Sequence, residues 1–224
     1  MPATASKKNY AVLMGDLIES SKFASPRKLH QLFNQLIASA NRQFGDNITS
    51  PLTITLGDEF QGLVASFNKA FELSQYLRLN LLLKGVKSRL VLGTATIETP
   101  VNPESAWNMM GKGLAEAREK LSDKREPNCY RFSFPAQPQL ELLLDGVGRS
   151  LTRVENDWTA TQLGYVFEVL SKSDKTRRQI ARSFNVSENS LYKALRSSHF
   201  SFYQQQITTI QTALKMEDEK QGRA

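Results

Sequence analysis

The segment Leu52-Thr-Ile-Thr-Leu-Gly-Asp-Glu-Phe-Gln-Gly-Leu-Val-Ala65 decides how this chain is expected to fold. Apolar and β-branched residues run up to Gly57, and apolar residues resume at Leu63. The pattern predicts a strand, a tight turn and a second strand. The carboxylates of Asp58 and Glu59 are then expected at the tip of the hairpin.

A second segment has the same pattern. Residues 10–20 read Tyr-Ala-Val-Leu-Met-Gly-Asp-Leu-Ile-Glu-Ser, an apolar run that ends at Gly15 and Asp16. If the two strands are neighbours in one sheet, Asp16 and Asp58 meet at the same edge. Paired carboxylates suit Mg²⁺ or Mn²⁺, because these cations prefer oxygen ligands. The alternative is that both aspartates only end strands and cap turns.

Length and composition bound the class of protein. The chain has 224 residues, of which 40% are hydrophobic, enough for one ordinary domain and a small one. Its apolar runs are too short to span a bilayer and its N-terminus does not resemble a signal peptide, so we expect a cytoplasmic protein without a membrane partner.

Cysteine and histidine usage narrows the chemistry further. The single cysteine, Cys129, excludes an internal disulfide and a multi-cysteine zinc site, and we expect it to be buried. The two histidines, His30 and His199, are far apart in helical patterns. A histidine-dependent nucleophilic mechanism therefore has little support.

The order of patterns from residue 10 to residue 134 predicts an α+β domain. Strands are expected at residues 10–15, in the hairpin, at 87–97 and at 129–134. Helices are expected after Ser25-Pro26, after Ser66, and around Leu114, where the third helix also includes Met110, Ala117 and Leu121. Helices that connect strands in this way are expected to cover one face of a ferredoxin-like or palm-like sheet. We expect the large apolar side chains of this region and its neighbour to be core: Trp107, Met109, Met110 and Trp158.

The remaining chain divides by composition. We expect a flexible tail at residues 1–9, a linker and connecting helix at 135–157, a helix-turn-helix domain at 158–216 and a disordered tail at 217–224. The boundary at 135 rests on Pro135-Ala-Gln-Pro138, because two prolines in four residues end a strand and delay a helix.

Positive charge is concentrated near the C-terminus. The net charge is +7, which fits an anionic partner such as a nucleotide or nucleic acid. Residues 172–196 hold two acids, Asp174 and Glu188, against seven bases: Lys172, Lys175, Arg177, Arg178, Arg182, Lys193 and Arg196.

The same segment has the spacing of a helix-turn-helix. Thr176 and Ser187 are expected to be N-caps, and Asn185-Val186 is expected to form the turn. Outward side chains of these types can contact base edges and phosphates, and they predict DNA binding by Arg177, Arg178, Asn189, Ser190, Lys193 and Arg196. A three-helix unit that serves only for packing is the alternative.

A final apolar seam leaves two alternatives open. Phe200, Tyr203, Ile207, Ile210 and Leu214 follow one another at steps of three and four residues. The seam can pack on its own domain or pair two chains as a homodimer.

Three short blocks carry a family resemblance. Gly15-Asp-Leu-Ile-Glu-Ser20, Gly57-Asp-Glu-Phe-Gln-Gly62 and Gly113-Leu-Ala-Glu-Ala-Arg118 resemble those of the bacterial SatD family. Over about the first 130 residues they are also similar to motifs of nucleotide cyclases of class III and of the GGDEF type. The resemblance implies a cyclase-type sheet domain that binds a nucleoside triphosphate with metal.

The cyclase resemblance also implies roles for individual residues. Asp16 and Asp58 would hold metal, with Glu59 and the Leu17 carbonyl as further ligands, and Arg118 would neutralise charge on the phosphates. Independently of the resemblance, Lys22, Arg89 and Lys112 are candidates for contacts to phosphate, with solvated surface side chains as the alternative for each. Leu114 replaces the asparagine of one cyclase block and Leu56 replaces the first glycine of the GGDEF hairpin. These departures favour binding over catalysis.

Three functions follow as hypotheses. The first is a regulator that binds a nucleotide through metal and DNA through the helix-turn-helix. The second is an active cyclase, in which the 3′-hydroxyl attacks the α-phosphate and pyrophosphate leaves. The third is a dimerisation scaffold that needs no nucleotide.

Overall fold

The computed structural model describes residues 9–171 and 175–223. Within them the chain forms a six-stranded sheet in the order β2-β3-β1-β4-β5, with β6 beside β4. Neighbouring strands are antiparallel except for β4 and β6, which are parallel. The strands are β1 (Asn9–Ile18), β2 (Ile48–Leu56), β3 (Glu59–Val64), β4 (Lys87–Ile97), β5 (Gly111–Lys112) and β6 (Tyr130–Ser133).

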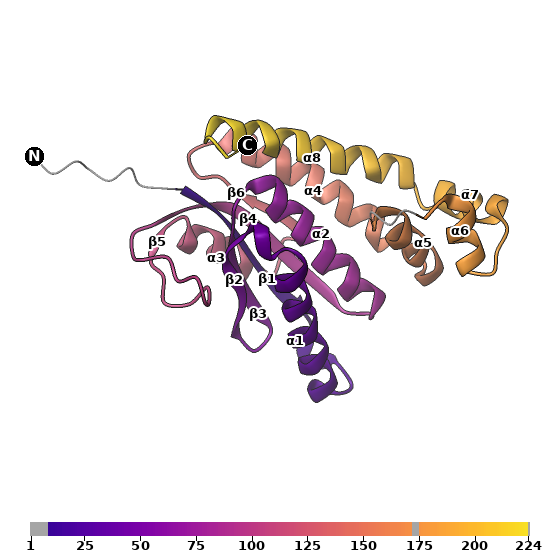
Figure 1. Ribbon diagram of the computed structural model, residues 1–224, viewed down its shortest axis with the longest axis horizontal. Helices are drawn as coiled ribbons and strands as arrows, with labels where there is room; N and C mark the ends of the chain where they lie inside the picture. The colour runs from indigo at the N-terminus through magenta and orange to yellow at the C-terminus, as the bar shows by residue number, and fades with distance from the viewer. Residues whose placement is uncertain (1–8, 172–174, 224) are drawn as a thin grey trace, which may run out of the picture.

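Helices connect and extend this sheet, as Figure 1 shows. They are α1 (Pro26–Gln43), α2 (Phe67–Leu83), α3 (Leu114–Ser122), α4 (Pro138–Asn156), α5 (Ala160–Leu170), α6 (Arg177–Ser183), α7 (Glu188–Ser197) and α8 (Phe200–Lys220), with short 3-10 turns η1 (Ser20–Lys22) and η2 (Gly45–Asn47). The helix starts expected after Ser25 and Ser66 are confirmed, since the hydroxyls of these two residues accept hydrogen bonds from Lys28 and Lys69 N–H.

Helices lie on both faces of the sheet, so the expectation of a single covered face is wrong. Successive residues of a strand point to opposite faces. Ala11 and Leu13 belong to the main core with residues of α1, α2 and α4, whereas Val12 and Met14 pack with α3. We call these the α1 face and the α3 face. The smaller cluster on the α3 face leaves part of that face uncovered.

The third helix begins later than expected. Residues 111–112 form β5, Gly113 adopts a left-handed conformation with φ of 89°, and α3 starts at Leu114. Met110 is therefore not helical and is 70% exposed, and Trp107 is 51% exposed. Their assignment to the core is wrong, whereas Met109 and Trp158 are partly buried against core clusters.

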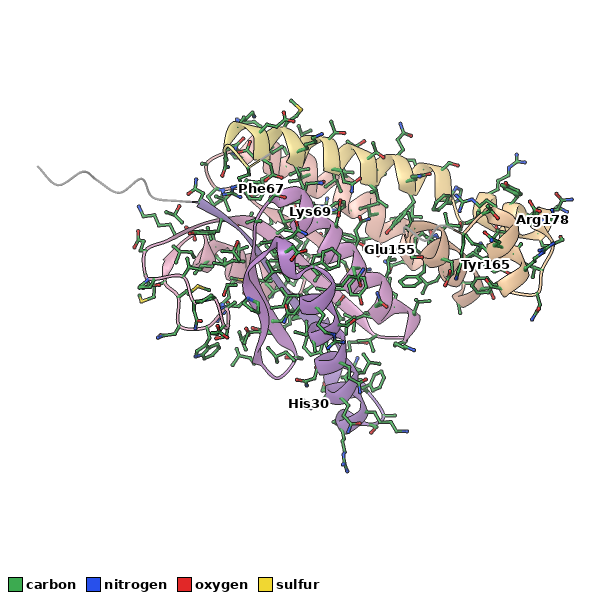
Figure 2. The ribbon with its side chains drawn as sticks, viewed as in Figure 1. His30, Phe67, Lys69, Glu155, Tyr165 and Arg178 are labelled. Carbon is green, nitrogen blue, oxygen red and sulfur yellow. The ribbon has the colours of Figure 1, made fainter. Side chains whose placement is uncertain are left out.

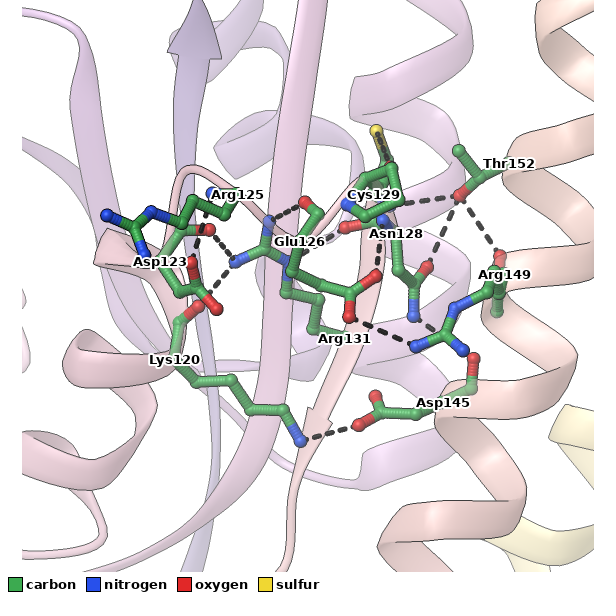
Figure 3. A network of polar contacts seen from close by, with 12 residues as sticks. Lys120, Asp123, Arg125, Glu126, Asn128, Cys129, Arg131, Asp145, Arg149 and Thr152 are labelled. Atoms are coloured by element: carbon green, nitrogen blue, oxygen red, sulfur yellow. Dashed lines mark hydrogen bonds and ion pairs between the residues drawn. The ribbon is translucent and has the colours of Figure 1, made fainter.

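The segment expected as a linker belongs to the sheet domain. Leu144 and Leu151 of α4 lie in the main core. The Asp145 carboxylate accepts a hydrogen bond from Phe132 N–H at 2.8 Å. It also pairs with the Lys120 ammonium at 2.6 Å (Figure 3). These contacts join α4 to β6 and α3, so residues 138–156 form a layer of the fold.

The C-terminal helix settles the two alternatives for the apolar seam. Tyr203, Ile207, Ile210 and Leu214 of α8 are buried in the main core, so the seam packs within the chain. The helix continues to Lys220, and the structure differs here from the disordered tail expected from residue 217. Asp218 is buried and accepts hydrogen bonds from Phe67 and Asn68 N–H, at the start of α2.

Three short helices lie at the end of the molecule remote from β5 (Figure 1). α5, α6 and α7 share a small apolar cluster that includes Val166, Ile180, Leu191 and Leu195. Trp158 joins this unit to α8, because its ring contacts Tyr203 and its N–H donates to the Ser198 carbonyl.

Candidate functional site

The ends of β1 and β3 meet as the sequence predicts. Leu17 N–H donates to the Asp58 carbonyl at 3.1 Å, and Asp16 is directly opposite Glu59 in the strand register. Opposed residues of antiparallel strands point to the same face. Asp16 and Glu59 therefore lie together on the α3 face.

Asp16 is a buried carboxylate next to a buried guanidinium. Its Oδ1 lies 3.0 Å from Nε of Arg89, the residue opposite it on β4, and the two residues are 6% and 7% exposed. The approach lacks hydrogen-bond alignment: among the described residues, Asp16 Oδ1 and Arg89 Nε and Nη1 have no hydrogen-bond partner. The charges of Asp16 and Arg89 thus lie next to each other, but the polar atoms of the two side chains are not all hydrogen-bonded.

Burial dominates the protonation of Asp16. The pKa of its carboxyl is raised from 3.8 to about 6 by the sum of several effects. Loss of solvent raises it most, the charges of Arg89 and Lys124 lower it, and those of Asp58 and Glu59 raise it. Neighbouring carboxylates are thus close enough to repel one another. A cation bound among them would relieve both the repulsion and the burial penalty.

Asp58 shares the edge with Asp16 but has other side-chain partners. It follows Gly57, whose φ of 64° makes the tight turn, and its Oδ2 accepts a hydrogen bond from the Ser20 hydroxyl at 2.5 Å. It borders a pocket of about 360 Å³ with Leu29 and His30 of α1. Asp58 is thus oriented toward α1, and Asp16 toward the α3 face.

Arg118 lies on the same face as Asp16. Its Nη2 donates to Gln61 Oε1 at 2.9 Å, and Gln61 is two residues along β3 from Glu59. Arg118 is exposed and borders a pocket of about 320 Å³ beside Met14 and Trp107.

The predicted phosphate contacts are not all brought to this site. Arg89 is held against Asp16, and Lys22 pairs with Glu19 at 2.5 Å close to Ser20. Lys112 is opposite Thr96, which pairs with Asn9 at the other end of β1. Asn9 and Asp16 are seven residue steps apart along β1, roughly 23 Å, so Lys112 does not join the site.

Sequence reasoning missed Ser20, Gln61 and Asn108. Ser20 is the hydrogen-bond partner of Asp58, while Gln61 and Asn108 line the pocket next to Arg118. Gln61 could have been found, because its spacing of two from Glu59 places it on the same face of a strand. Asn108 and Trp107 had no such signal, since they come from an irregular loop.

The carboxylates fit a divalent cation only in part. Asp16 offers a buried oxygen without a hydrogen bond, and Glu59 lies on the same face. Within residues 9–171 and 175–223 no cluster of three or more His, Cys, Asp or Glu side chains is placed to hold a metal. Asp16 and Glu59 supply oxygen atoms of the kind that a hard cation prefers, but Oδ1 of Asp16 faces Arg89 in this structure.

The second candidate surface is formed by α6 and α7. The Thr176 and Ser187 caps are present, and Asn185 makes the turn between the helices with φ of 55°. The outward residues Asn189, Ser190, Lys193 and Arg196 are exposed. Lys172 and Asp174, part of the predicted basic segment, lie outside the described residues.

Other cations of this surface already have neighbours. Arg178, labelled in Figure 2 at the outer end of α6, lies 3.7 Å from Glu188, and the Arg177 guanidinium lies over the Phe200 ring. Lys193 and Arg196 of α7 have no salt bridge among the described residues. Together with Arg182 of α6, which is also exposed and has no salt bridge among the described residues, they are available to an anionic partner.

Comparison with protein families shows the family to which the chain belongs. The family model described as the SatD family matches residues 10–214. The chain belongs to the SatD family. The match covers both the sheet and the C-terminal helices, so the SatD unit includes both. A comparison with curated proteins gives no match.

Solved structures give a loose likeness. Two structures of a bacterial light-regulated adenylyl cyclase match with TM-scores of 0.39 and 0.38 and sequence identities of 14% and 15%. In both cases the match covers 59% of this chain and 45% of the other. The SatD protein thus spans less than half the length of those chains. No helix in the described part of the chain is long and apolar enough to cross a membrane.

Proposed function

We propose that this SatD-family protein is a regulator that binds a nucleotide with Mg²⁺ or Mn²⁺ on its sheet domain and binds DNA through α6 and α7. Asp16 and Glu59 would hold the metal, Asp58 borders the same edge from the side of α1, and Arg118 contacts the phosphates. The metal, when bound, neutralises and polarises the phosphate oxygens.

One observation carries the proposal. The Asp16 carboxylate is removed from solvent, its pKa is raised to about 6, and its Oδ1 has no hydrogen bond. A carboxylate that only ended a strand would gain nothing from this arrangement. Groups with a shifted pKa and without a hydrogen-bond partner concentrate at sites that bind ligands, because the ligand supplies the missing polar contacts.

The topology supports the same assignment. The order β1-α1-β2-β3-α2-β4, with strands arranged β2-β3-β1-β4, is that of a ferredoxin-like domain. In this order the end of β1 and the β2–β3 turn meet at one edge. The Leu17–Asp58 hydrogen bond fixes that meeting point.

The assignment of α6 and α7 as a DNA-binding helix-turn-helix rests on their caps, their turn and their exposed bases. Asn189 and Ser190 lie in the first turn of α7, the part of a recognition helix that contacts base edges. Lys193 and Arg196 are placed to contact phosphates.

A second candidate is turnover of the nucleotide to a cyclic product. It is favoured by Arg118, an exposed cation on the face that carries Asp16, since a cation there can neutralise charge that develops on the phosphates. Leu114, which replaces a cyclase asparagine, weighs against it.

The test measures binding and turnover together. Titrate the protein with each nucleoside triphosphate by calorimetry, with Mg²⁺, with Mn²⁺ and with neither, and assay pyrophosphate and cyclic product. We expect metal-dependent binding that Asp16→Ala abolishes. Product that disappears in the same variant would establish the cyclase. Absence of both binding and product would overturn the proposal and leave a scaffold.

A further inference from the structure

The loop between β4 and β5 is held firmly against the sheet. Ala106 is buried, and its N–H lies 2.9 Å from the Thr53 hydroxyl on β2. Its carbonyl accepts a hydrogen bond from the Gln61 side chain on β3. Earlier in the loop, the Ser50 hydroxyl donates to the Asn102 carbonyl at 2.6 Å. These contacts fix the position of the next residue, Trp107.

Trp107 is nevertheless half exposed. A tryptophan side chain buries a large apolar area when it packs, so leaving it at the surface forfeits stabilisation. Its neighbours show that the loop is able to bury side chains, because Ala106 and Met109 both pack inward. A firmly placed, exposed indole is typical of a surface that stacks on a planar ligand.

The pocket beside Trp107 continues from the acidic site. Its volume of about 320 Å³ is at the lower end of the range for small-molecule sites, and its lining includes Met14, Gln61, Trp107, Asn108 and Arg118. Met14 and Gln61 each lie two residues from Asp16 and Glu59 on the same strands, about 7 Å away. This is a separation that a ribose can bridge.

We infer that the pocket takes the purine base of the nucleotide, stacked on the Trp107 indole. This inference rests on the proposed nucleotide binding and assigns the part of the site that selects the base. Arg118 lies between the base and the metal-bound phosphates, held by Gln61. A purine is favoured over a pyrimidine because its larger ring system covers more of the indole.

Asn108 supplies hydrogen bonds for the edge of the base. It lines the pocket next to Trp107, and its carboxamide makes no hydrogen bond within the described chain. Its backbone φ of 57° shows that the turn holds this residue in an uncommon conformation. A carboxamide offers a donor and an acceptor side by side, the pattern that matches the N6 and N7 atoms of adenine.

Intrinsic fluorescence tests the inference directly, because the chain has only two tryptophans. In Trp158→Phe the signal comes from Trp107 alone, and in Trp107→Phe it comes from Trp158 alone. Each variant is titrated with ATP, GTP, CTP and UTP in the presence of Mg²⁺, with calorimetry in parallel and circular dichroism to verify folding.

We expect ATP to quench the fluorescence of Trp107, with a dissociation constant equal to that from calorimetry. The fluorescence of Trp158 is expected not to change. Trp107→Ala is expected to bind ATP about 5- to 100-fold more weakly, in line with the loss of one base–aromatic stack. Asn108→Asp is expected to lose the preference for ATP over GTP, because a carboxylate only accepts hydrogen bonds.

The outcomes separate this inference from the proposed function. The base site would be overturned, and the nucleotide function would stand, if calorimetry shows ATP binding, Trp107 fluorescence does not change and Trp107→Ala binds ATP as tightly as the parent. Tighter binding of CTP and UTP than of ATP would also overturn it. If no triphosphate binds, the proposed function fails and the base site fails with it.

Discussion

Arg78 and Glu155 form a buried ion pair, with Arg78 Nε 2.5 Å from Glu155 Oε2 and both side chains closed to solvent. The other Glu155 oxygen accepts hydrogen bonds from the hydroxyls of Tyr130 and Tyr203 at 2.7 Å. Figure 2 shows Glu155 in the interior, where the sheet domain meets the C-terminal helices. The four residues come from α2, β6, α4 and α8, so this cluster fastens those helices to the sheet.

A backbone contact also connects the Arg78–Glu155 cluster to the acidic site at Asp16. Arg78 Nη1 donates to the Ser88 carbonyl, and Ser88 directly precedes Arg89, the partner of Asp16. On the other side, Tyr203 contacts Trp158, which donates to Ser198 at the end of α7. The acidic site at Asp16 and the α6–α7 surface thus share one set of packed residues.

Removing one partner of the buried pair should destabilise the whole chain. Glu155→Ala leaves the Arg78 charge buried without compensation, and we expect a loss of about 3–5 kcal/mol in the free energy of unfolding. The double variant Arg78→Met, Glu155→Leu should recover much of that loss, because it removes both charges. Urea denaturation measures both. A double variant less stable than Glu155→Ala would contradict this account.

Asp16→Asn should remove a pH dependence of stability while it destroys the site. Because the folded-state pKa is about 6 and the ordinary value is 3.8, the folded state holds the proton more tightly. Stability contributed by Asp16 is therefore complete below about pH 4 and is lost as pH rises through 6. Between pH 4 and pH 8 we expect the parent to lose roughly 1–3 kcal/mol that Asp16→Asn does not lose, measured by urea denaturation at both pH values. Because the variant also leaves Arg89 without its charge partner, the comparison is between pH values and not between absolute stabilities. A variant that loses as much stability as the parent between pH 4 and pH 8 would contradict the assignment.

Two glycines of α4 provide a matched pair for the packing of this helix on β6. A Cβ on Gly148 would lie 2.2 Å from the Tyr130 carbonyl oxygen, whereas a Cβ on Gly146 meets nothing within 4 Å. Gly148→Ala should force α4 from the sheet and lower the melting temperature. Gly146→Ala should raise stability by up to about 1 kcal/mol, because alanine favours helix. Equal melting temperatures for the two variants would be inconsistent with this packing.

Asp218 should act as a cap for a helix 150 residues away in the sequence. Its carboxylate accepts the N–H groups of Phe67 and Asn68, which otherwise lack helical partners. We expect Asp218→Ala to cost about 1–2 kcal/mol by thermal denaturation, and Asp218→Asn to cost less. Glu219→Ala is the control, since its side chain is exposed; a cost as large for Glu219 would argue against a specific cap.

DNA binding should depend on α7 and on salt. Lys193→Ala and Arg196→Ala are each expected to weaken binding and to reduce the slope of log affinity against log salt by about 1. Fluorescence anisotropy with duplex DNA between about 50 and 200 mM salt measures both. Lys84→Ala, at the end of α2, is the control and should change neither quantity. An affinity independent of salt would exclude phosphate-led binding by this surface.

The sequence by itself determined the local elements of this protein. Ser25-Pro26 and Ser66 begin helices, Gly57-Asp58 turns the hairpin, and alternating apolar residues form β4, because caps, turns and periodicity act over a few residues. The same local signals placed Asp16 and Asp58 at the ends of neighbouring strands.

Only the tertiary structure decided what surrounds those elements. The sequence could not show that Arg89 lies against Asp16, that Trp107 is exposed beside Arg118, or that Asp218 caps α2. Nor could it show that α4 and α8 are layers of the sheet domain. Each of these facts depends on contacts between distant segments. Packing and burial over the whole chain set such contacts, and the spacing of apolar residues within one segment does not specify its partner.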